Sequence, residues 1–370
     1  MGTILLRTTT KDYEGKYHVY PDKLAEGTTW FPHWNYASID WKSVRNLHIL
    51  VEDRYSYSQK NDVKDGIYLS KYGSQVLLYG VSKKPEQWYV DQCRENLVLL
   101  NVNSKNTETL NLSRVVNLRY LRIGRSGYTP IYRFVQGVES LTKLEELSLN
   151  NISLSDDLDL EQMTLLQHID IRPAGNNHSI SIRGIHRQKE LKSLRLWFAL
   201  YPDRLDVSWF PGLEELALHF LEGSTRVGGV SSLKHLKELN LGGSSSRDIP
   251  DLSALPHLIS LVLQHFPDCT TLPGIGSQKD LDYLCINNLG IRQIPDGIRN
   301  LKNLENLELY ELELDELPHA QLPPDHHGAP GPEDGEEGEA HQEAKEGVEG
   351  ALHPGQGQAL LHVEAVQVLE

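Results

Sequence analysis

A short motif, L-x-x-L-x-L, recurs along the middle of this 370-residue chain and constrains its fold more than any other feature. Its leading residues are Leu118, Leu144, Leu166, Leu191, Leu213, Leu236, Leu258, Leu281 and Leu304. The intervals between them are 26, 22, 25, 22, 23, 22, 23 and 23 residues. Looser copies begin at Val44, Val76 and Leu97. Near-constant spacing over so many copies predicts an array of stacked units rather than separate globular domains.

The spacing inside each motif predicts a β-strand. In the copy that begins at Leu191, Leu194 and Leu196 are two residues apart and therefore lie on one side of a strand, while Arg195 faces the other side. A second apolar set precedes each motif, as at Ile298 and Leu301, and fits a returning leg. These features predict an α/β leucine-rich-repeat solenoid, curved and right-handed, with parallel strands on its concave face.

One position of the usual repeat is altered throughout. Regular leucine-rich repeats carry asparagine three residues after the last leucine of the strand motif. The residues found here are Ser126, Ile152, Ala174, Ala199, Leu221, Ser244, Phe266, Leu289 and Leu312. Because no asparagine ladder can form, we expect an irregular solenoid of variable curvature.

The chain is predicted to have three regions. Residues 1–43 hold many aromatic residues without a repeat and are expected to form an N-terminal flank or cap. Residues 44–318 form the repeat domain. Residues 319–370 are acidic, with abundant Gly, Glu and His, and predict a disordered tail. This tail is either a native extension or the product of a disrupted reading frame, and its failure to cap or continue the repeats favours the second origin.

Composition limits the compartment and the partners. Three cysteines cannot form a disulfide framework, which favours a reduced, cytoplasmic location. No run of 18 or more apolar residues is present, so no membrane span is expected. The net charge is −15, most of it in the tail, and this gives no basic surface for nucleic acid.

No pattern in the sequence predicts catalysis, a metal or a cofactor. His235 and His257 precede the leading leucines of neighbouring repeats, but two ligands without a third do not make a zinc site. There is no Gly-x-Ser-x-Gly elbow, and no cysteine lies in a nucleophile signature. Pro273-Gly-Ile-Gly276 lacks the rest of a dinucleotide fingerprint. We therefore expect a non-catalytic protein.

A binding surface is expected on the concave face, where residues alternate with the buried leucines. Arg195 and Trp197 share one strand, and Arg172 and His219 stand at the position of Trp197 in the repeats before and after. Together they predict an aromatic centre with basic neighbours, suited to an acidic protein surface. A second candidate surface is a later column containing Tyr283 and Tyr310.

Several segments resemble the repeats of plant nucleotide-binding leucine-rich-repeat immune receptors. The strongest is residues 291–309, which includes Ile294-Pro295-Asp-Gly-Ile298-Arg-Asn-Leu301. Residues 138–149 are similar, and residues 43–51 resemble the way the repeat region begins in that family. The resemblance implies a recognition module for a pathogen or host protein, active in defence.

The chain departs from that family in one respect. It holds no Gly-x-x-x-x-Gly-Lys-[Ser/Thr] phosphate-binding loop, so ATP binding is not carried over. The resemblance then implies an isolated recognition segment, either a truncated receptor or a short form, whose early repeats face a nucleotide-binding domain missing from this chain. Two alternatives remain open: a general intracellular adaptor without a defence role, and an enzyme whose site the sequence does not reveal.

Overall fold

The computed structural model divides the chain into two compact units, Met1–His235 (unit 1) and Leu236–Glu370 (unit 2). The residues that the structure describes are 9–11, 17–19, 29–31, 37, 39, 41, 47–52, 66–69, 75–79, 86–103, 109–124, 134–154, 157–173, 180–197, 199–200, 204–219, 226–243, 249–315 and 359–364. Both units are built from the repeats that the sequence predicts.

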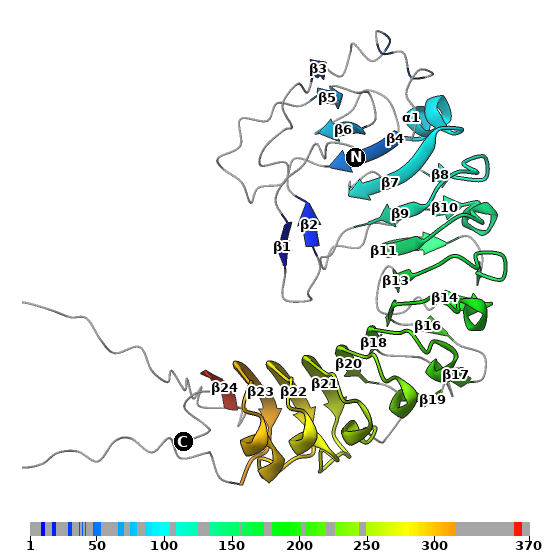
Figure 1. Ribbon diagram of the computed structural model, residues 1–370. Helices are drawn as coiled ribbons and strands as arrows, with labels where there is room; N and C mark the ends of the chain where they lie inside the picture. The colour runs from blue at the N-terminus through cyan, green and yellow to red at the C-terminus, as the bar shows by residue number, and fades with distance from the viewer. Residues whose placement is uncertain are drawn as a thin grey trace, which may run out of the picture. The chain divides into compact units, whose positions relative to one another are not determined.

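Unit 1 contains a sheet of parallel strands, one from each successive repeat (Figure 1). The strands are β4 (Leu47–Glu52), β7 (Leu97–Asn103), β9 (Tyr120–Ile123), β11 (Glu146–Leu154), β13 (His168–Pro173), β15 (Ser193–Trp197) and β18 (Glu215–His219). Each pairs in parallel with the next strand in this series. The order follows the chain because each strand motif returns one repeat later. The prediction of a leucine-rich-repeat solenoid is confirmed.

The returning legs of unit 1 carry short strands and 3₁₀ turns. The strands are β8 (Leu110–Asn111), β10 (Phe134–Gln136), β12 (Leu158–Asp159), β14 (Ile180–Arg183), β16 (Ala199–Leu200), β17 (Arg204–Asp206) and β19 (Arg226–Gly228). The turns are η2 (Val138–Ser140), η3 (Ile185–Arg187), η4 (Val207–Trp209) and η5 (Val230–Ser232). One α-helix, α1 (Glu86–Cys93), precedes β7. No helix among the described residues is long and apolar enough to cross a membrane.

The first strands of unit 1 depart from the repeat order. They are β1 (Thr9–Lys11), β2 (Tyr17–Val19), β3 (Thr29–Phe31), β5 (Gly66–Leu69) and β6 (Gln75–Tyr79). Strand β4 pairs in parallel with both β6 and β7, and β5 pairs antiparallel with β3 and β6. The loose motif copy at Val76 therefore lies on the far side of β4 and does not stack between its sequence neighbours.

Part of the aromatic N-terminal flank packs against helix α1 within unit 1. Trp41 is buried and lies edge-on to Trp88 and Tyr89, with ring centroids 6.2 and 5.5 Å away. Both partners belong to α1. Most of residues 1–43 lies outside the described residues, and the described parts are this aromatic contact, the antiparallel pair of β1 and β2, and the pairing of β3 with β5.

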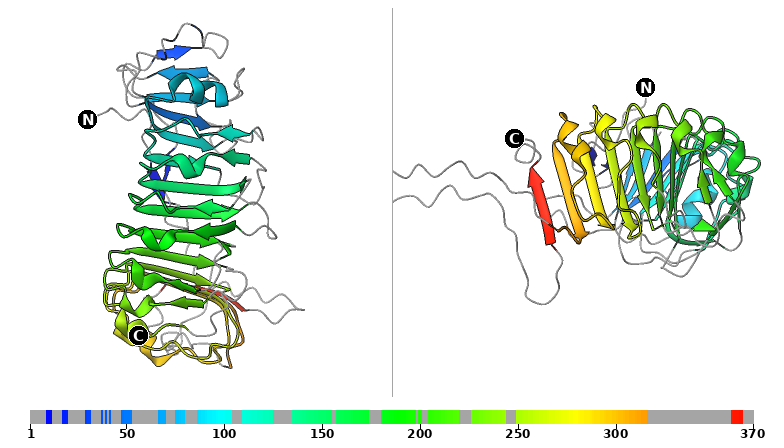
Figure 2. Two further views of the ribbon diagram at one scale, coloured as in Figure 1. Left: turned by 90° about the vertical axis from the view of Figure 1, so that its right-hand side faces the viewer. Right: turned by 90° about the horizontal axis from the view of Figure 1, so that it is seen from below.

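Unit 2 continues the same architecture. Its parallel strands are β20 (Glu238–Gly242), β21 (Ser260–Phe266), β22 (Tyr283–Leu289) and β23 (Asn306–Leu312). The turns η6 (Leu252–Ala254), η7 (Ile275–Ser277) and η8 (Asp296–Asn300) lie on the returning legs. Figure 2 shows β21 to β23 side by side, with β24 (Ala359–Glu364) next to them in red.

Strand β24 lies within residues 319–370, the region that the sequence predicts to be a disordered tail. It pairs antiparallel with β23, whereas the pairs β20–β21, β21–β22 and β22–β23 are parallel. Leu361 and Val363 stand opposite the buried Leu309 and Leu307 in register. The alternating apolar pattern of β24 therefore matches that of β23, the strand with which it pairs. Residues 319–358 and 365–370 lie outside the described residues.

A column of apolar side chains forms the core of each unit. In unit 1 it contains Leu100, Leu121, Leu147, Ile169, Leu194 and Leu216, and in unit 2 it contains Leu239, Leu261, Leu284 and Leu307. All are at most 1% exposed. Each buried leucine contributes roughly 1.5–3 kcal/mol. This burial offsets the ordering of the backbone only when neighbouring repeats are stacked.

The altered asparagine position has a structural explanation. Residues directly before it adopt a left-handed backbone in four repeats: Asn151, His265, Asn288 and Glu311, with φ of 53°, 60°, 53° and 51°. The strand register shifts there, as between Asn150 and Ile152. This bulge directs an apolar residue into the core in place of asparagine, so that Ile152, Phe266, Leu289 and Leu312 are all buried. At this position, Ser126, Ala174, Leu221 and Ser244 lie outside the described residues.

The turns that precede the 3₁₀ segments alternate between two chemistries, a pattern that sequence analysis missed. Every second repeat has a glycine with φ of 75–81°: Gly137, Gly184, Gly229 and Gly274. The repeats between them have an aspartate whose Oδ1 accepts a hydrogen bond from the backbone N–H two residues later: Asp159, Asp206 and Asp251, at 2.9, 3.1 and 3.0 Å.

Glycine is required because its backbone lies directly against the neighbouring aspartate turn. A Cβ atom on Gly229 would lie 2.4 Å from Asp206 Oδ1 and 2.7 Å from Ser208 N. Its φ of 81° is also costly for any residue with a side chain. The alternation lets each aspartate close its own turn while the next repeat packs on top of it.

Gly229→Ala is therefore expected to lower the free energy of unfolding by at least about 1–2 kcal/mol, from backbone strain alone. Gly212→Ala is the matched control, because a Cβ there meets nothing within 4 Å. It should leave stability unchanged or raise it by about 0.4–1 kcal/mol. Urea unfolding of both variants measures the difference, and equal stabilities would show that the close turn packing is wrong.

Candidate protein-binding surface

The sheet of unit 1 has a polar side, which we call the unit 1 strand face. It consists of the residues that alternate with the buried column on β9, β11, β13, β15 and β18: Tyr120, Arg122, Glu146, Ser148, Asn150, His168, Asp170, Arg172, Ser193, Arg195, Trp197, Glu215, Ala217 and His219. Because successive side chains of a strand point to opposite sides, this set follows directly from the leucine motif.

Arg172, Trp197 and His219 form a stack across three adjacent strands. The guanidinium carbon of Arg172 lies 3.9 Å from the centre of the Trp197 ring. The rings of Trp197 and His219 are 3.8 Å apart and nearly parallel, with an interplanar angle of 4°. Trp197 and His219 are also partners in strand register. The predicted proximity of these three residues is confirmed.

The stack buries one of the residues expected to offer contact surface. His219 is 0% exposed, so the expectation that it faces a partner is wrong. The Trp197 ring lies flat against its imidazole. Trp197 and Arg172 remain partly exposed, which makes them the accessible members of the stack. Tryptophan and arginine are the residue types most enriched at binding hot spots.

The basic character expected around Trp197 is partly neutralised. Arg195 lies 3.1 Å from Glu215, measured from Nη2 to Oε2, and its side chain is only 14% exposed. The same Glu215 oxygen accepts a hydrogen bond from Ser193 Oγ at 2.8 Å. This differs from the expected patch of free basic groups, because the motif alone does not reveal which acidic residues lie on the next strand.

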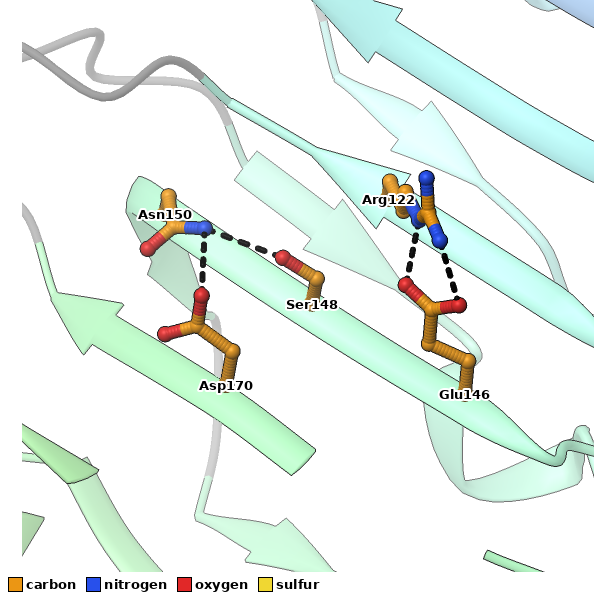
Figure 3. A network of polar contacts seen from close by, with 5 residues as sticks. All are labelled: Arg122, Glu146, Ser148, Asn150 and Asp170. Carbon is orange, nitrogen blue, oxygen red and sulfur yellow. Dashed lines mark hydrogen bonds and ion pairs between the residues drawn. The ribbon is translucent and has the colours of Figure 1, made fainter. Parts of the chain in front are cut away.

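The other half of the unit 1 strand face forms a polar network (Figure 3). Arg122 binds both carboxylate oxygens of Glu146, with Nη2 2.7 Å from Oε2. Asn150 Nδ2 donates to Ser148 Oγ at 2.9 Å and to Asp170 Oδ2 at 3.4 Å. Burial lowers the pKa of Arg122, but the hydrogen bonds and charge of Glu146 outweigh burial and raise that pKa above its usual value. The side chains are thus held in fixed positions before any partner binds.

Tyr283 and Tyr310 lie in unit 2 and do not form one column, contrary to prediction. Tyr283 pairs with Asn306, whereas Tyr310 pairs with Asn287. The two tyrosines stand two and six residues after the leading leucines of their repeats, so they lie four register positions apart on adjacent strands. Tyr283 Oη donates to Glu308 Oε2 at 2.7 Å. Burial, followed by this hydrogen bond, raises the pKa of Tyr283.

The described residues include no cluster of three or more His, Cys, Asp or Glu side chains that could hold a metal ion. His257 is well exposed and lies 3.8 Å from Asp280. All three cysteines are buried and free of disulfides. Burial raises the pKa of Cys93 and of Cys285 to about 12, so both stay protonated at neutral pH.

The cysteines are expected to resist alkylation in the native protein. Iodoacetamide reacts with thiolate, and neither Cys93 nor Cys285 ionises appreciably at pH 8 when its pKa is about 12. Because burial disfavours the thiolate, ionisation of either cysteine opposes folding. The free energy of unfolding therefore keeps its full value below the ordinary pKa of 9.0 and falls as the pH rises towards 12. Mass spectrometry should show slow labelling in buffer and rapid labelling in urea. Rapid labelling in buffer would contradict the buried positions.

Trp197 is expected to contribute to stability as well as to surface. Trp197→Ala removes a ring stack and a cation–π contact and should lower the free energy of unfolding by about 1–3 kcal/mol. Trp197→Phe should lose less, because a flat ring remains. His168→Ala, at an exposed position of the same face, should change stability by less than about 0.5 kcal/mol. Urea unfolding tests this order, and an unchanged Trp197→Ala variant would contradict the stack.

No family model and no curated protein matches the chain. Among solved structures, internalin C2 of Listeria monocytogenes is 17% identical, covers 49% of this chain and 77% of its own, and has a TM-score of 0.36. A leucine-rich-repeat protein of Leptospira interrogans is 21% identical, with coverages of 65% and 68% and a TM-score of 0.41. A second Listeria internalin, inlF, is 18% identical, with coverages of 62% and 72% and a TM-score of 0.41. The assignment to leucine-rich repeats stands on the parallel strand registers.

Proposed function

We propose that this chain is a non-catalytic protein-recognition module and that the unit 1 strand face around Trp197 is its contact surface. The observation that carries the proposal is the stack of Arg172, Trp197 and His219. It places a large, partly exposed aromatic surface on a rigid sheet, with the arginine already fixed against it. Less side-chain freedom is then lost when a partner binds.

The surroundings of Trp197 support recognition of a protein rather than of a charged small molecule. Arg195 is paired with Glu215, and Arg122 with Glu146, so the face has several polar groups but little free charge. A central aromatic surface with polar groups around it is the usual composition of a protein interface. Fixed ion pairs at the edge mainly favour the correct partner over others.

We further propose that the recognition serves immune sensing in the cytoplasm. The support is the resemblance of residues 291–309 and 138–149 to the repeats of plant nucleotide-binding leucine-rich-repeat receptors. The partner would then be a pathogen protein, a host protein or a nucleotide-binding domain. A general adaptor without a defence role is the alternative, because the same face would serve either function.

Site-specific photo-crosslinking in plant cells tests the proposal. A photoreactive amino acid at His168 lies on the unit 1 strand face, whereas one at Lys189 is equally exposed but lies in a turn outside it. The His168 probe should capture a discrete protein, and Trp197→Ala should abolish that capture. A pathogen protein or a nucleotide-binding domain among the captured proteins supports immune sensing, and unrelated host proteins support the adaptor.

Two outcomes would overturn the proposed surface. One is identical capture from the His168 and Lys189 probes, which would show that the contacts are nonspecific. The other is capture at His168 that Trp197→Ala leaves unchanged while the variant remains folded by circular dichroism. Trp197→Phe provides the matched control, since it keeps an aromatic ring in the stack.

A further inference from the structure

Unit 2 has a strand face of its own, with a different charge balance. We call the outward-facing set on β20 to β23 the unit 2 strand face: Glu238, Asn240, Gly242, Ser260, Val262, Gln264, Tyr283, Cys285, Asn287, Asn306, Glu308 and Tyr310. It includes two glutamates and no lysine or arginine. In the unit 1 strand face, by contrast, arginines neutralise Glu146 and Glu215.

Glu308 is the centre of this acidic face. It is partly buried and accepts a hydrogen bond from Tyr283 at 2.7 Å. Tyr310 stands two residues later on the same strand, so both side chains lie on one side of the sheet, and their Cα atoms are roughly 6–7 Å apart along the strand. Burial is the first cause of the raised pKa of Tyr283, and the charges of Cys285, Glu308 and Tyr310 also contribute, because these groups lie close together.

The unit 2 strand face also has hydrogen-bond acceptors without donors. Within the described part of the chain, Asn240 Oδ1 and Asn287 Oδ1 are buried and have no hydrogen-bond partner. Asn287 pairs in register with Tyr310, next to Glu308. A buried acceptor left unsatisfied costs roughly 1–3 kcal/mol. Glu308 and Asn287 Oδ1 thus offer acceptors on adjacent strands, and no basic side chain occupies an outward position on β20 to β23.

The group that fits this arrangement is a guanidinium. It carries five N–H donors and no acceptor, stacks on aromatic rings, and binds carboxylates through two parallel hydrogen bonds. An ammonium group offers three donors at one point and cannot stack in the same way. Strand β24 pairs with the edge of β23 and therefore lies beside the unit 2 strand face. This pairing does not place β24 over the face.

We propose that the unit 2 strand face binds an arginine-containing basic segment of a partner protein, with the guanidinium on Glu308 and against the Tyr310 ring. Asn287 Oδ1, on the neighbouring strand, is the further acceptor that lacks a partner. This inference rests on the proposed function, because it assigns a partner chemistry to a second part of the same recognition module. It concerns residues separate from the Trp197 stack, so the two can fail independently.

Fluorescence anisotropy with the full chain tests the inference. The probes are labelled arginine-rich, lysine-rich and glutamate-rich peptides of equal length. The arginine-rich peptide should bind most tightly, and Glu308→Gln should weaken it about five- to tenfold, as expected for loss of one charge-assisted contact. Glu305→Gln is the matched control, because Glu305 is exposed in the turn before β23 and the net charge changes equally. It should change the affinity less than about twofold.

A pair of substitutions at Tyr310 separates stacking from charge. Tyr310→Phe should keep the affinity for the arginine-rich peptide, and Tyr310→Ala should lose it about threefold or more. This pair also provides the test if Glu308→Gln does not fold. Equal losses in Glu308→Gln and Glu305→Gln would overturn the inference, because they would show attraction by net charge alone. Trp197→Ala should leave peptide binding unchanged, whatever its effect in the crosslinking experiment.

Discussion

The stacked apolar column is the interaction on which the rest of the structure depends. A single repeat of about 23 residues cannot enclose its own leucines, and only a neighbour on each side removes them from water. Leu121, Leu147 and Leu194 are each 0% exposed because their strands lie between others. Every polar feature of the strand faces follows from this column, since fixing the leucines inward fixes the alternate residues outward.

The turns show how the column tolerates irregular repeats. An aspartate turn and a positive-φ glycine alternate along the returning legs, and the glycine backbone fits where a Cβ would meet its neighbour. At the other end of the strands, a left-handed residue such as Asn151 or Asn288 directs the next apolar side chain into the core. Backbone conformation at a few positions therefore replaces the missing asparagine ladder, and the repeats can vary in length between these points.

The sequence was sufficient for the strands, the column and the grouping of Arg172 with Trp197 and His219, because all three depend only on spacing from a leading leucine. It was insufficient for predicting which side chains of the strand face are buried and which of them form ion pairs. The motif does not show that Trp197 would lie flat on His219 or that Glu215 would hold Arg195, since both depend on rotamers and on the neighbouring strand.

Two other errors have simple causes. Tyr283 and Tyr310 were placed in one column although they stand at different positions of the motif, and the strand register separates them. Strand β24 was missed because an acidic, glycine-rich composition outweighed a short alternating pattern at the end of the tail. Composition is an average over a segment, whereas strand pairing needs only a few residues in register with an unpaired edge.

The two strand faces solve the same problem of exposed polar groups in different ways. In unit 1, arginines on adjacent strands pair with Glu146 and Glu215, and the Trp197 ring with Arg172 against it stays partly exposed. A partner there gains mainly by covering aromatic surface, and little charge has to be desolvated. In unit 2, no arginine or lysine occupies an outward position on β20 to β23, and the hydrogen-bond donor to Glu308 is a tyrosine hydroxyl in place of an arginine. A partner that brings donors therefore completes interactions that the fold leaves unmade, and this is where charge should decide which partner is accepted.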